Sequence, residues 1–284
     1  MLASLIIVFR EVIEAGLIVG IVLAATRGVA RRGMWVGIGI GAGVLGACIV
    51  AAFAEQISAQ FEGYGQELFN ATILILAVGM LTWHNVWMAG HGKQMAREMR
   101  ALGAEVSAGR RTLTALAIVV GVAVLREGSE VVLFLYGIAA QGGMSATALL
   151  SGGALGLLAG AAVSAAMYYG LLTIPAHRLF AVTGWLITLL AAGMAAQAVL
   201  FLQNGGYLQI LMTPVWDTSW LLPEGGDGVL GIIGRMLHTL IGYSDQPDGL
   251  QLIAYLGTIV AINVLMRVVN RGKPAPAAVP SPAE

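Results

Sequence analysis

The sequence predicts an all-α, polytopic membrane protein with seven transmembrane helices. Hydrophobic residues make up 58% of the chain and charged residues only 11%, and the mean hydropathy is +0.85. This composition is far from that of a soluble globular protein. A helix needs about 20 apolar residues to cross a bilayer, and such segments are expected at about residues 4–25, 34–54, 68–88, 114–137, 147–172, 180–202 and 251–268.

Charged residues interrupt the first and the fourth apolar segments in the same pattern. The motif Arg-Glu-x-x-Glu occurs at Arg10, Glu11 and Glu14 and returns 116 residues later at Arg126, Glu127 and Glu130. Because a charged side chain at the centre of a bilayer costs about 2.5–3.5 kcal/mol on insertion scales, it persists there only when it is paired, hydrated or bound to an ion. Helical spacing places the three charges of each motif on one face. Four carboxylates against two guanidinium groups leave two negative charges unmatched, and a metal cation would balance them.

The first three segments and the next three look like two copies of one unit. The third segments share the pattern Leu-Ala-x-Gly-Met, which ends at Met80 and at Met194. The second segments carry glycines at four-residue intervals, which we expect to let helices approach closely: Gly33, Gly37, Gly41, Gly152, Gly156 and Gly160. Since each copy has an odd number of spans, the second copy would cross the membrane in the opposite sense. The sequence thus predicts a 3+3 inverted repeat plus one extra helix, with the two charged helices meeting near the bilayer centre.

This repeat divides the chain into four parts. Residues 1–112 are the first repeat with a cytoplasmic loop, residues 113–203 the second repeat, residues 204–270 an extracytoplasmic segment with the seventh span, and residues 271–284 a tail of disordered composition. The extracytoplasmic segment mixes aromatic residues with a short helical apolar pattern. We therefore expect it to fold back onto the outer membrane interface.

The distribution of charge predicts the orientation. Most of the 15 lysines and arginines fall in loops on one side, and cation-rich loops stay on the cytoplasmic side, so the N-terminus is expected outside and the C-terminus inside. The stretch from Lys93 to Arg111 is expected to be a cytoplasmic loop beside anionic lipid heads. Four acidic residues on the outer side are candidates for a vestibule that concentrates cations, or are ordinary solvated charges: Glu55, Glu62, Glu67 and Asp217.

Carboxylate oxygens favour hard cations such as Fe3+, Mn2+, Ca2+ or Mg2+ over Cu+ and Zn2+, and the charge count permits Fe2+ and Fe3+ alike. Arg10 and Arg126 can each grip a carboxylate with two hydrogen bonds and keep it ionised while no ion is bound. A di-iron enzyme centre would need a histidine three residues after a glutamate on two helices, and the sequence has no such spacing. We expect interface or capping roles, rather than metal binding, for the histidines near helix ends or in loops: His84, His91, His177 and His238. His84, beside Trp83 at the inner end of the third span, is the hardest of these to dismiss as a ligand.

These features resemble the oxidase-dependent iron permeases, a family that includes fungal high-affinity iron permeases and the bacterial Efe-type permease. The family hallmark is Arg-Glu-Gly-Leu-Glu in the first and fourth spans, and this chain has Val12-Ile13 in place of Gly-Leu in the first motif and Ser129 in place of Leu in the second. The stretch Trp216-Asp-Thr-Ser-Trp220 also resembles the bacterial members.

The resemblance implies import of Fe2+ or Fe3+ across the cytoplasmic membrane, with iron as the transported substrate and no organic cofactor. It implies as ion ligands Glu11, Glu14, Glu127 and Glu130. It also implies a separate extracytoplasmic ferroxidase or iron-delivery protein, and neither an enzymatic activity of this chain nor a nucleic-acid partner. The sequence leaves open the oligomeric state and two alternatives: a proton-coupled carrier of another solute or of another divalent metal such as Mn2+ or Pb2+, and a non-transporting membrane subunit.

Overall fold

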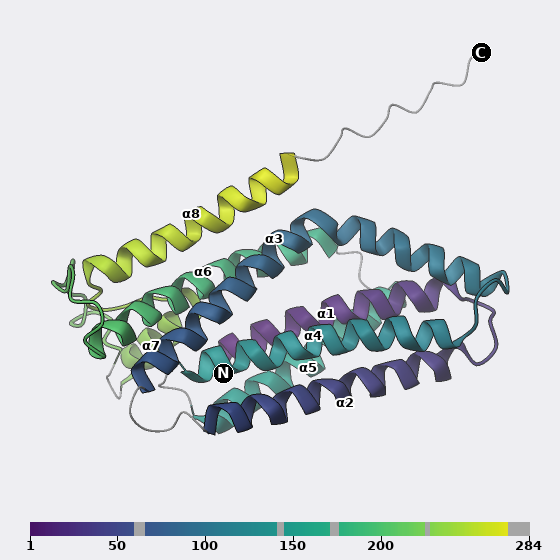
Figure 1. Cartoon of the computed structure of the whole chain (residues 1–284), viewed down its shortest axis with the longest axis horizontal. Helices are drawn as coiled ribbons and strands as arrows, with labels where there is room; N and C mark the ends of the chain where they lie inside the picture. The colour runs from purple at the N-terminus through teal and green to yellow at the C-terminus, as the bar shows by residue number, and fades with distance from the viewer. Residues whose placement is uncertain (60–65, 141–144, 171–175, 225–227, 272–284) are drawn as a thin grey trace, which may run out of the picture.

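The computed structural model describes residues 1–59, 66–140, 145–170, 176–224 and 228–271, which form an elongated bundle of α-helices (Figure 1). The helices are α1 (Leu2–Ala25), α2 (Arg32–Ala59), α3 (Gln66–Ser107), α4 (Thr114–Ala140), α5 (Ala146–Tyr168), α6 (Ala176–Asn204), α7 (Val229–Ile241) and α8 (Gly249–Arg271). These ranges contain no β-strand, so the predicted all-α class is confirmed.

Five of the described helices are long and apolar enough to cross a membrane, namely α2, α3, α5, α6 and α8. They correspond to the second, third, fifth, sixth and seventh predicted spans. The chain is therefore a multi-pass membrane protein. The two other long helices, α1 and α4, have 24 and 27 residues, but each carries the three charges of one motif near its middle.

The third helix is longer than the sequence predicts. A loop is expected over Lys93–Arg111, whereas α3 continues to Ser107 and reaches 42 residues. Good helix formers fill this extension, and Gln94 donates a hydrogen bond of 2.8 Å to Glu98 one turn later. At its end, the hydroxyl of Ser107 donates to the carbonyl oxygen of Ala25 at 3.0 Å. The prediction of a loop is wrong because basic residues on a solvated helix face leave the same charge signature as a basic loop.

Each helix of the first half packs mainly against a helix of the second half. α1 lies along α5, α2 along α4 and α3 along α6, while α8 covers α6 and α3 (Figure 1). α1 and α4 also contact each other within the bundle. They run in opposite directions, because the loop that leads into α4 starts at Ser107, beside the last residue of α1.

Glycines permit the closest of these helix pairs. A Cβ atom at Gly43 of α2 would lie 2.7 Å from the carbonyl oxygen of Gly121 in α4, and one at Gly156 of α5 would lie 2.5 Å from that of Leu5 in α1. Gly160 of α5 meets α1 in the same way, so the predicted packing role of the α5 glycines is confirmed.

The predicted glycine column of α2 is wrong. A Cβ atom at Gly33, Gly37 or Gly41 would meet nothing within 4 Å, whereas Gly39 and Gly43 face α4. α2 carries small residues on two of its faces at four-residue intervals, and the spacing alone does not say which face meets a partner.

Charged residues lie inside the bundle, and large apolar side chains cover its outside. Leu45 of α2, Leu158 of α5 and Val260 of α8 are each at least 60% exposed, while Glu11 and Glu127 are at most 4% exposed. This is the arrangement expected of a bundle surrounded by lipid, in which ionisable groups face the interior. The motif carboxylates therefore do not face the acyl chains.

The described residues of the stretch between α6 and α8 make tertiary hydrogen bonds with one another. The backbone N–H of Thr218 donates to the carbonyl oxygen of Asp245 at 2.8 Å, and the Thr218 and Tyr243 hydroxyls share a hydrogen bond of 2.6 Å. α7 ends at Ile241 and is capped by Gly242, whose φ of +69° is typical of a glycine at this position. The position of this stretch at the membrane interface stays a prediction.

Candidate metal site

α1 and α4 bring the two charged motifs together in the interior of the bundle. In the first motif, Nη1 of Arg10 lies 2.9 Å from Oε1 of Glu11, and Nη2 lies 2.9 Å from Oε1 of Glu14. All three side chains are at most 3% exposed. One guanidinium group therefore holds both carboxylates of its own motif.

The second motif is paired less completely. Nε of Arg126 lies 3.2 Å from Oε1 of Glu130 but 3.9 Å from Oε1 of Glu127, and the Arg126 side chain is 31% exposed. The guanidinium carbon of Arg126 also lies 4.3 Å from the ring centroid of Trp87 in α3, a cation–π contact. Glu127 is thus the motif carboxylate with the weakest contact to an arginine.

A third helix supplies a histidine to this centre. His84 of α3 is 2% exposed. Its Nε2 lies 3.3 Å from Oε2 of Glu14 and 3.8 Å from Oε2 of Glu11, while its Nδ1 contacts Oε2 of Glu130. The imidazole ring therefore lies between the carboxylates of the two motifs.

Four of these residues are close enough to share one ion. One ligand atom each from Glu11, His84, Glu127 and Glu130 lies within 4.8 Å of the others. Metal–oxygen distances of about 2.0–2.6 Å place opposite ligands of one cation about 4–5 Å apart, so the spacing suits a single ion. Glu14 is outside this group, and its carboxylate contacts Arg10 and His84.

The carboxylates have more acceptor capacity than their neighbours satisfy. In the two motifs, five buried carboxylate oxygens accept no hydrogen bond of ordinary geometry: Oε2 of Glu11, both oxygens of Glu14, Oε2 of Glu127 and Oε2 of Glu130. Unsatisfied buried acceptors are costly. A cation bound among them would satisfy several at once.

Three of the four predicted ligands thus meet in one cluster, and both predicted arginine partners make ion pairs with motif glutamates. The expectation for His84 is wrong, because it lies among the carboxylates rather than at an interface or cap. Its position was hidden by the predicted end of the third helix near residue 88, which placed His84 at a membrane boundary.

The structure describes the side chains of two of the four predicted outer acids, Glu67 and Asp217. The side chain of Glu55 and all of Glu62 lie outside the described residues. Glu67 lies in the first turn of α3 beside Gly205, at the end of the bundle that carries the folded stretch between α6 and α8. Asp217 is exposed and accepts hydrogen bonds from the hydroxyl and the backbone N–H of Ser219, at 2.6 and 3.0 Å, which lower the pKa of Asp217.

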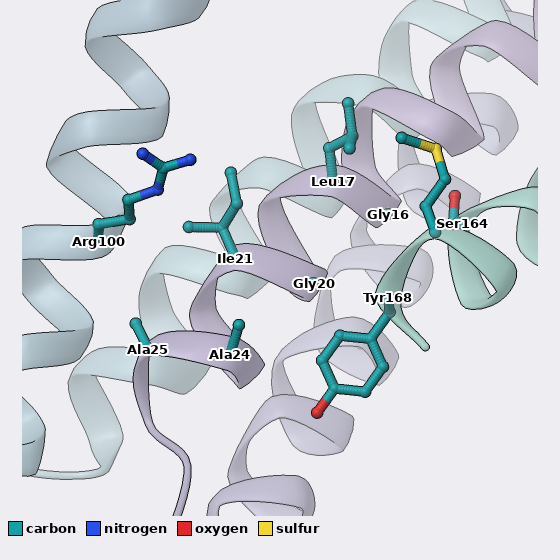
Figure 2. Close-up of a pocket in the computed structure, with 10 residues that line it drawn as sticks. Gly16, Leu17, Gly20, Ile21, Ala24, Ala25, Arg100, Ser164 and Tyr168 are labelled. Carbon is teal, nitrogen blue, oxygen red and sulfur yellow. The ribbon is translucent and has the colours of Figure 1, made fainter. Parts of the chain in front are cut away.

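A cavity of about 450 Å³ lies along the part of α1 that follows the motif, from Gly16 to Ala25. Figure 2 shows α1 passing between Arg100 of α3 and the side chains of Ser164 and Tyr168 of α5. Leu17 and Ile21 line this cavity three and seven residues after Glu14, which is roughly the same helix face. The cavity walls are mostly apolar and include a cation, so it is a poor site for a metal ion.

Comparisons with known proteins identify related sequences. The sequence model of the Iron permease FTR1 family matches residues 1–274. The ferrous iron permease EfeU of Yersinia pestis is 28% identical over 271 residues, 93% of each chain, and that of Escherichia coli O6:H1 is 29% identical over 254 residues, 87% of this chain and 88% of the relative. No solved structure matches this chain.

Proposed function

This chain belongs to the iron permease FTR1 family, and we propose that it imports iron across the cytoplasmic membrane through the carboxylate cluster between α1 and α4. A permease family makes it a transporter and not an enzyme. The relatives are named as ferrous iron permeases, which supports Fe2+ as the ion that enters. Both Fe2+ and Fe3+ suit the charge of the site.

One observation carries this proposal: buried carboxylates of both motifs converge, with oxygens that no hydrogen-bond donor satisfies. Four glutamates face two arginines and His84, so negative charges outnumber positive ones even with a protonated histidine. A purely structural ion-pair network would need equal numbers of each sign, since every unpaired buried charge costs several kcal/mol. The excess of negative charge supports a site built for a cation.

The packing of the glycines supports the inverted repeat. Gly43 meets Gly121 and Leu125, and Gly156 meets Leu5 and Phe9. The α4 residues lie 116 positions after their α1 counterparts, as Arg126 lies after Arg10. Equivalent contacts in two halves of opposite direction are those of a pseudo-twofold axis in the membrane plane. We infer that α1 and α4 also span the membrane, which gives seven spans.

The route follows from the same layout. We propose that iron enters from the side where α3 begins, with Glu55, Glu62, Glu67 and Asp217 as outer acids, and leaves toward the basic end of α3. An inside-negative potential favours this direction by about 2.3 kcal/mol per charge per 100 mV. An extracytoplasmic ferroxidase or iron-delivery protein is the partner that the family resemblance implies.

Uptake of radioactive iron into proteoliposomes tests the site. We expect Glu11→Gln and Glu127→Gln each to reduce the uptake rate at least about tenfold, because an amide cannot replace a charged ligand. Glu105→Gln is the matched control, since Glu105 pairs with Arg111 at an exposed position. Near-normal uptake by Glu127→Gln with correctly inserted protein would refute the assignment. Uptake driven by pH and untouched by chelators would favour a proton-coupled carrier of another solute.

A further inference from the structure

His84 occupies a place in the site that helix packing does not explain. Its two ring nitrogens face opposite motifs, with Nε2 toward Glu14 and Nδ1 against Glu130. No hydrogen bond of ordinary geometry satisfies either nitrogen within the described part of the chain. A histidine that only joins helices would be expected to make hydrogen bonds of ordinary geometry, as buried polar groups generally do.

The next residue already joins the helices at this level. Nδ2 of Asn85 donates to the carbonyl oxygen of Gly184 and to the hydroxyl of Thr188, both at 3.1 Å, and so links α3 to α6. The contact between α3 and α6 therefore does not depend on His84. The imidazole of His84 instead contacts the carboxylates of α1 and α4.

The geometry points to a specific role, and we propose that His84 is a nitrogen ligand of the transported ion that favours transition-metal ions over Ca2+ and Mg2+. This inference rests on the proposed function. His84 is the one non-carboxylate member of the four-residue group within 4.8 Å. Imidazole suits iron, zinc, copper and nickel, whereas carboxylate, carbonyl and water oxygens suit Ca2+ and Mg2+.

The repeat does not duplicate this ligand. The offset of 114 that relates Gly79 to Gly193 relates His84 to Ala198, a buried residue of α6 without a donor atom. The site therefore offers an ion one nitrogen ligand, from His84, and several carboxylate oxygen ligands. One imidazole ligand is enough to give transition-metal ions a higher affinity than Ca2+ and Mg2+, which a site with oxygen ligands alone would not do.

Competition between ions tests the role of His84. The rate of uptake of radioactive Fe2+, kept reduced with ascorbate, is measured in proteoliposomes at increasing concentrations of external Ca2+. We expect His84→Asn, which offers a neutral oxygen of the kind Ca2+ accepts, to lower the Ca2+ concentration that halves iron uptake at least about tenfold. The control is Trp83→Leu, on the same turn but 71% exposed, and it should leave this concentration unchanged. An unchanged value for a transporting His84→Asn variant overturns the inference.

A second measurement does not depend on how well that variant folds. Pulsed electron paramagnetic resonance of Mn2+ bound to the unmodified protein should reveal hyperfine coupling to a 14N nucleus. The coupling should persist in His238→Gln, which changes a histidine outside the site. Bound Mn2+ without nitrogen coupling in the unmodified protein overturns the inference.

The two proposals fail in different ways. If the unmodified protein takes up no iron, or if Glu127→Gln transports normally, the proposed function fails and the inference fails with it. If Glu127→Gln abolishes uptake while His84→Asn keeps the original Ca2+ sensitivity, the inference alone fails.

Discussion

At the scale of residues, two motifs with the same charged positions have different surroundings. Arg10 is buried and contacts both glutamates of its motif, whereas Arg126 is partly exposed and contacts mainly Glu130. Buried carboxylates depend on the arginine between them for stabilisation of their charges, because water is excluded. Where the arginine is partly exposed, water also stabilises the charges, and the ion pair contributes less. The first motif is therefore the more rigid side of the site, and Glu127 of the second has the fewest competing contacts for an ion.

This difference predicts unequal effects on stability. Arg10→Gln leaves two buried carboxylates without their partner, and losing one member of a buried ion pair costs about 3–5 kcal/mol. Arg126→Gln should cost less, because its pair is partly exposed. Thermal unfolding in detergent without metal should give the lower midpoint for Arg10→Gln. Equal midpoints for the two variants would contradict this account of the site.

The charged residues of the site could be predicted from the sequence, because their cost in lipid demands that they face each other. His84 could not be. Whether a residue of α3 reaches the space between α1 and α4 depends on the tilt and rotation of α3, and neither is encoded in the local pattern around Trp83 and Asn85.

At the scale of elements, close packing at small residues holds α2 on α4 and α5 on α1. Adding a methyl group at Gly43 or Gly156 would bring a Cβ atom within 2.7 Å of a partner backbone, while Gly37 faces open space. We expect Gly43→Ala and Gly156→Ala to destabilise the protein by about 1–3 kcal/mol. Gly37→Ala should be neutral or stabilising by about 0.5–1 kcal/mol. Denaturation in detergent gives the free energy of unfolding of each of the three variants. A loss of stability for Gly37→Ala equal to that of the other two would refute this packing.

The stretch between α6 and α8 carries a pH-dependent contact. Nδ1 of His238 lies 3.4 Å from Oε1 of Glu224 and 2.8 Å from the carbonyl oxygen of Tyr243, and the bond with Glu224 raises the pKa of His238 above 6.5. A pKa raised by folding gives stability that is complete below about pH 6.5 and is lost as the pH rises through the raised value.

Hydrogen exchange measures this contact. The backbone N–H of Asp245 donates to Oε1 of Glu224 at 3.0 Å. After correction for the intrinsic rate, its protection should decrease as the pH rises above 6.5, and His238→Gln should remove the pH dependence. Protection that does not vary with pH in the unmodified protein would show that His238 does not stabilise this stretch.

Element boundaries show where local patterns stop being informative. Hydropathy locates the apolar part of α3 correctly, but the helix continues to Ser107, because good helix formers and the contact with Ala25 extend it past the apolar region. Glycine spacing identifies close packing in α5 and selects the wrong face of α2. In both cases the deciding interaction is with a helix distant in sequence.

At the scale of the whole molecule, the bundle has an apolar exterior, a charged interior and two dissimilar ends. The α1–α2 and α3–α4 loops share one end, where the chain carries Arg27, Arg31, Arg110 and Arg111 (Figure 1). The folded stretch between α6 and α8 lies beside Glu67 at the other end. This polarity agrees with the proposed inward direction, from an acidic outer end through the carboxylate cluster to a basic inner end.

The central claim is that the two halves of the chain hold one cation between them. Anomalous diffraction from crystals soaked with Fe2+ or Mn2+ tests this most directly. The account predicts a single strong peak between α1 and α4, within about 2.0–2.6 Å of carboxylate oxygens of Glu11, Glu127 and Glu130. A peak found only outside the bundle, with those three carboxylates still free of metal, would contradict it.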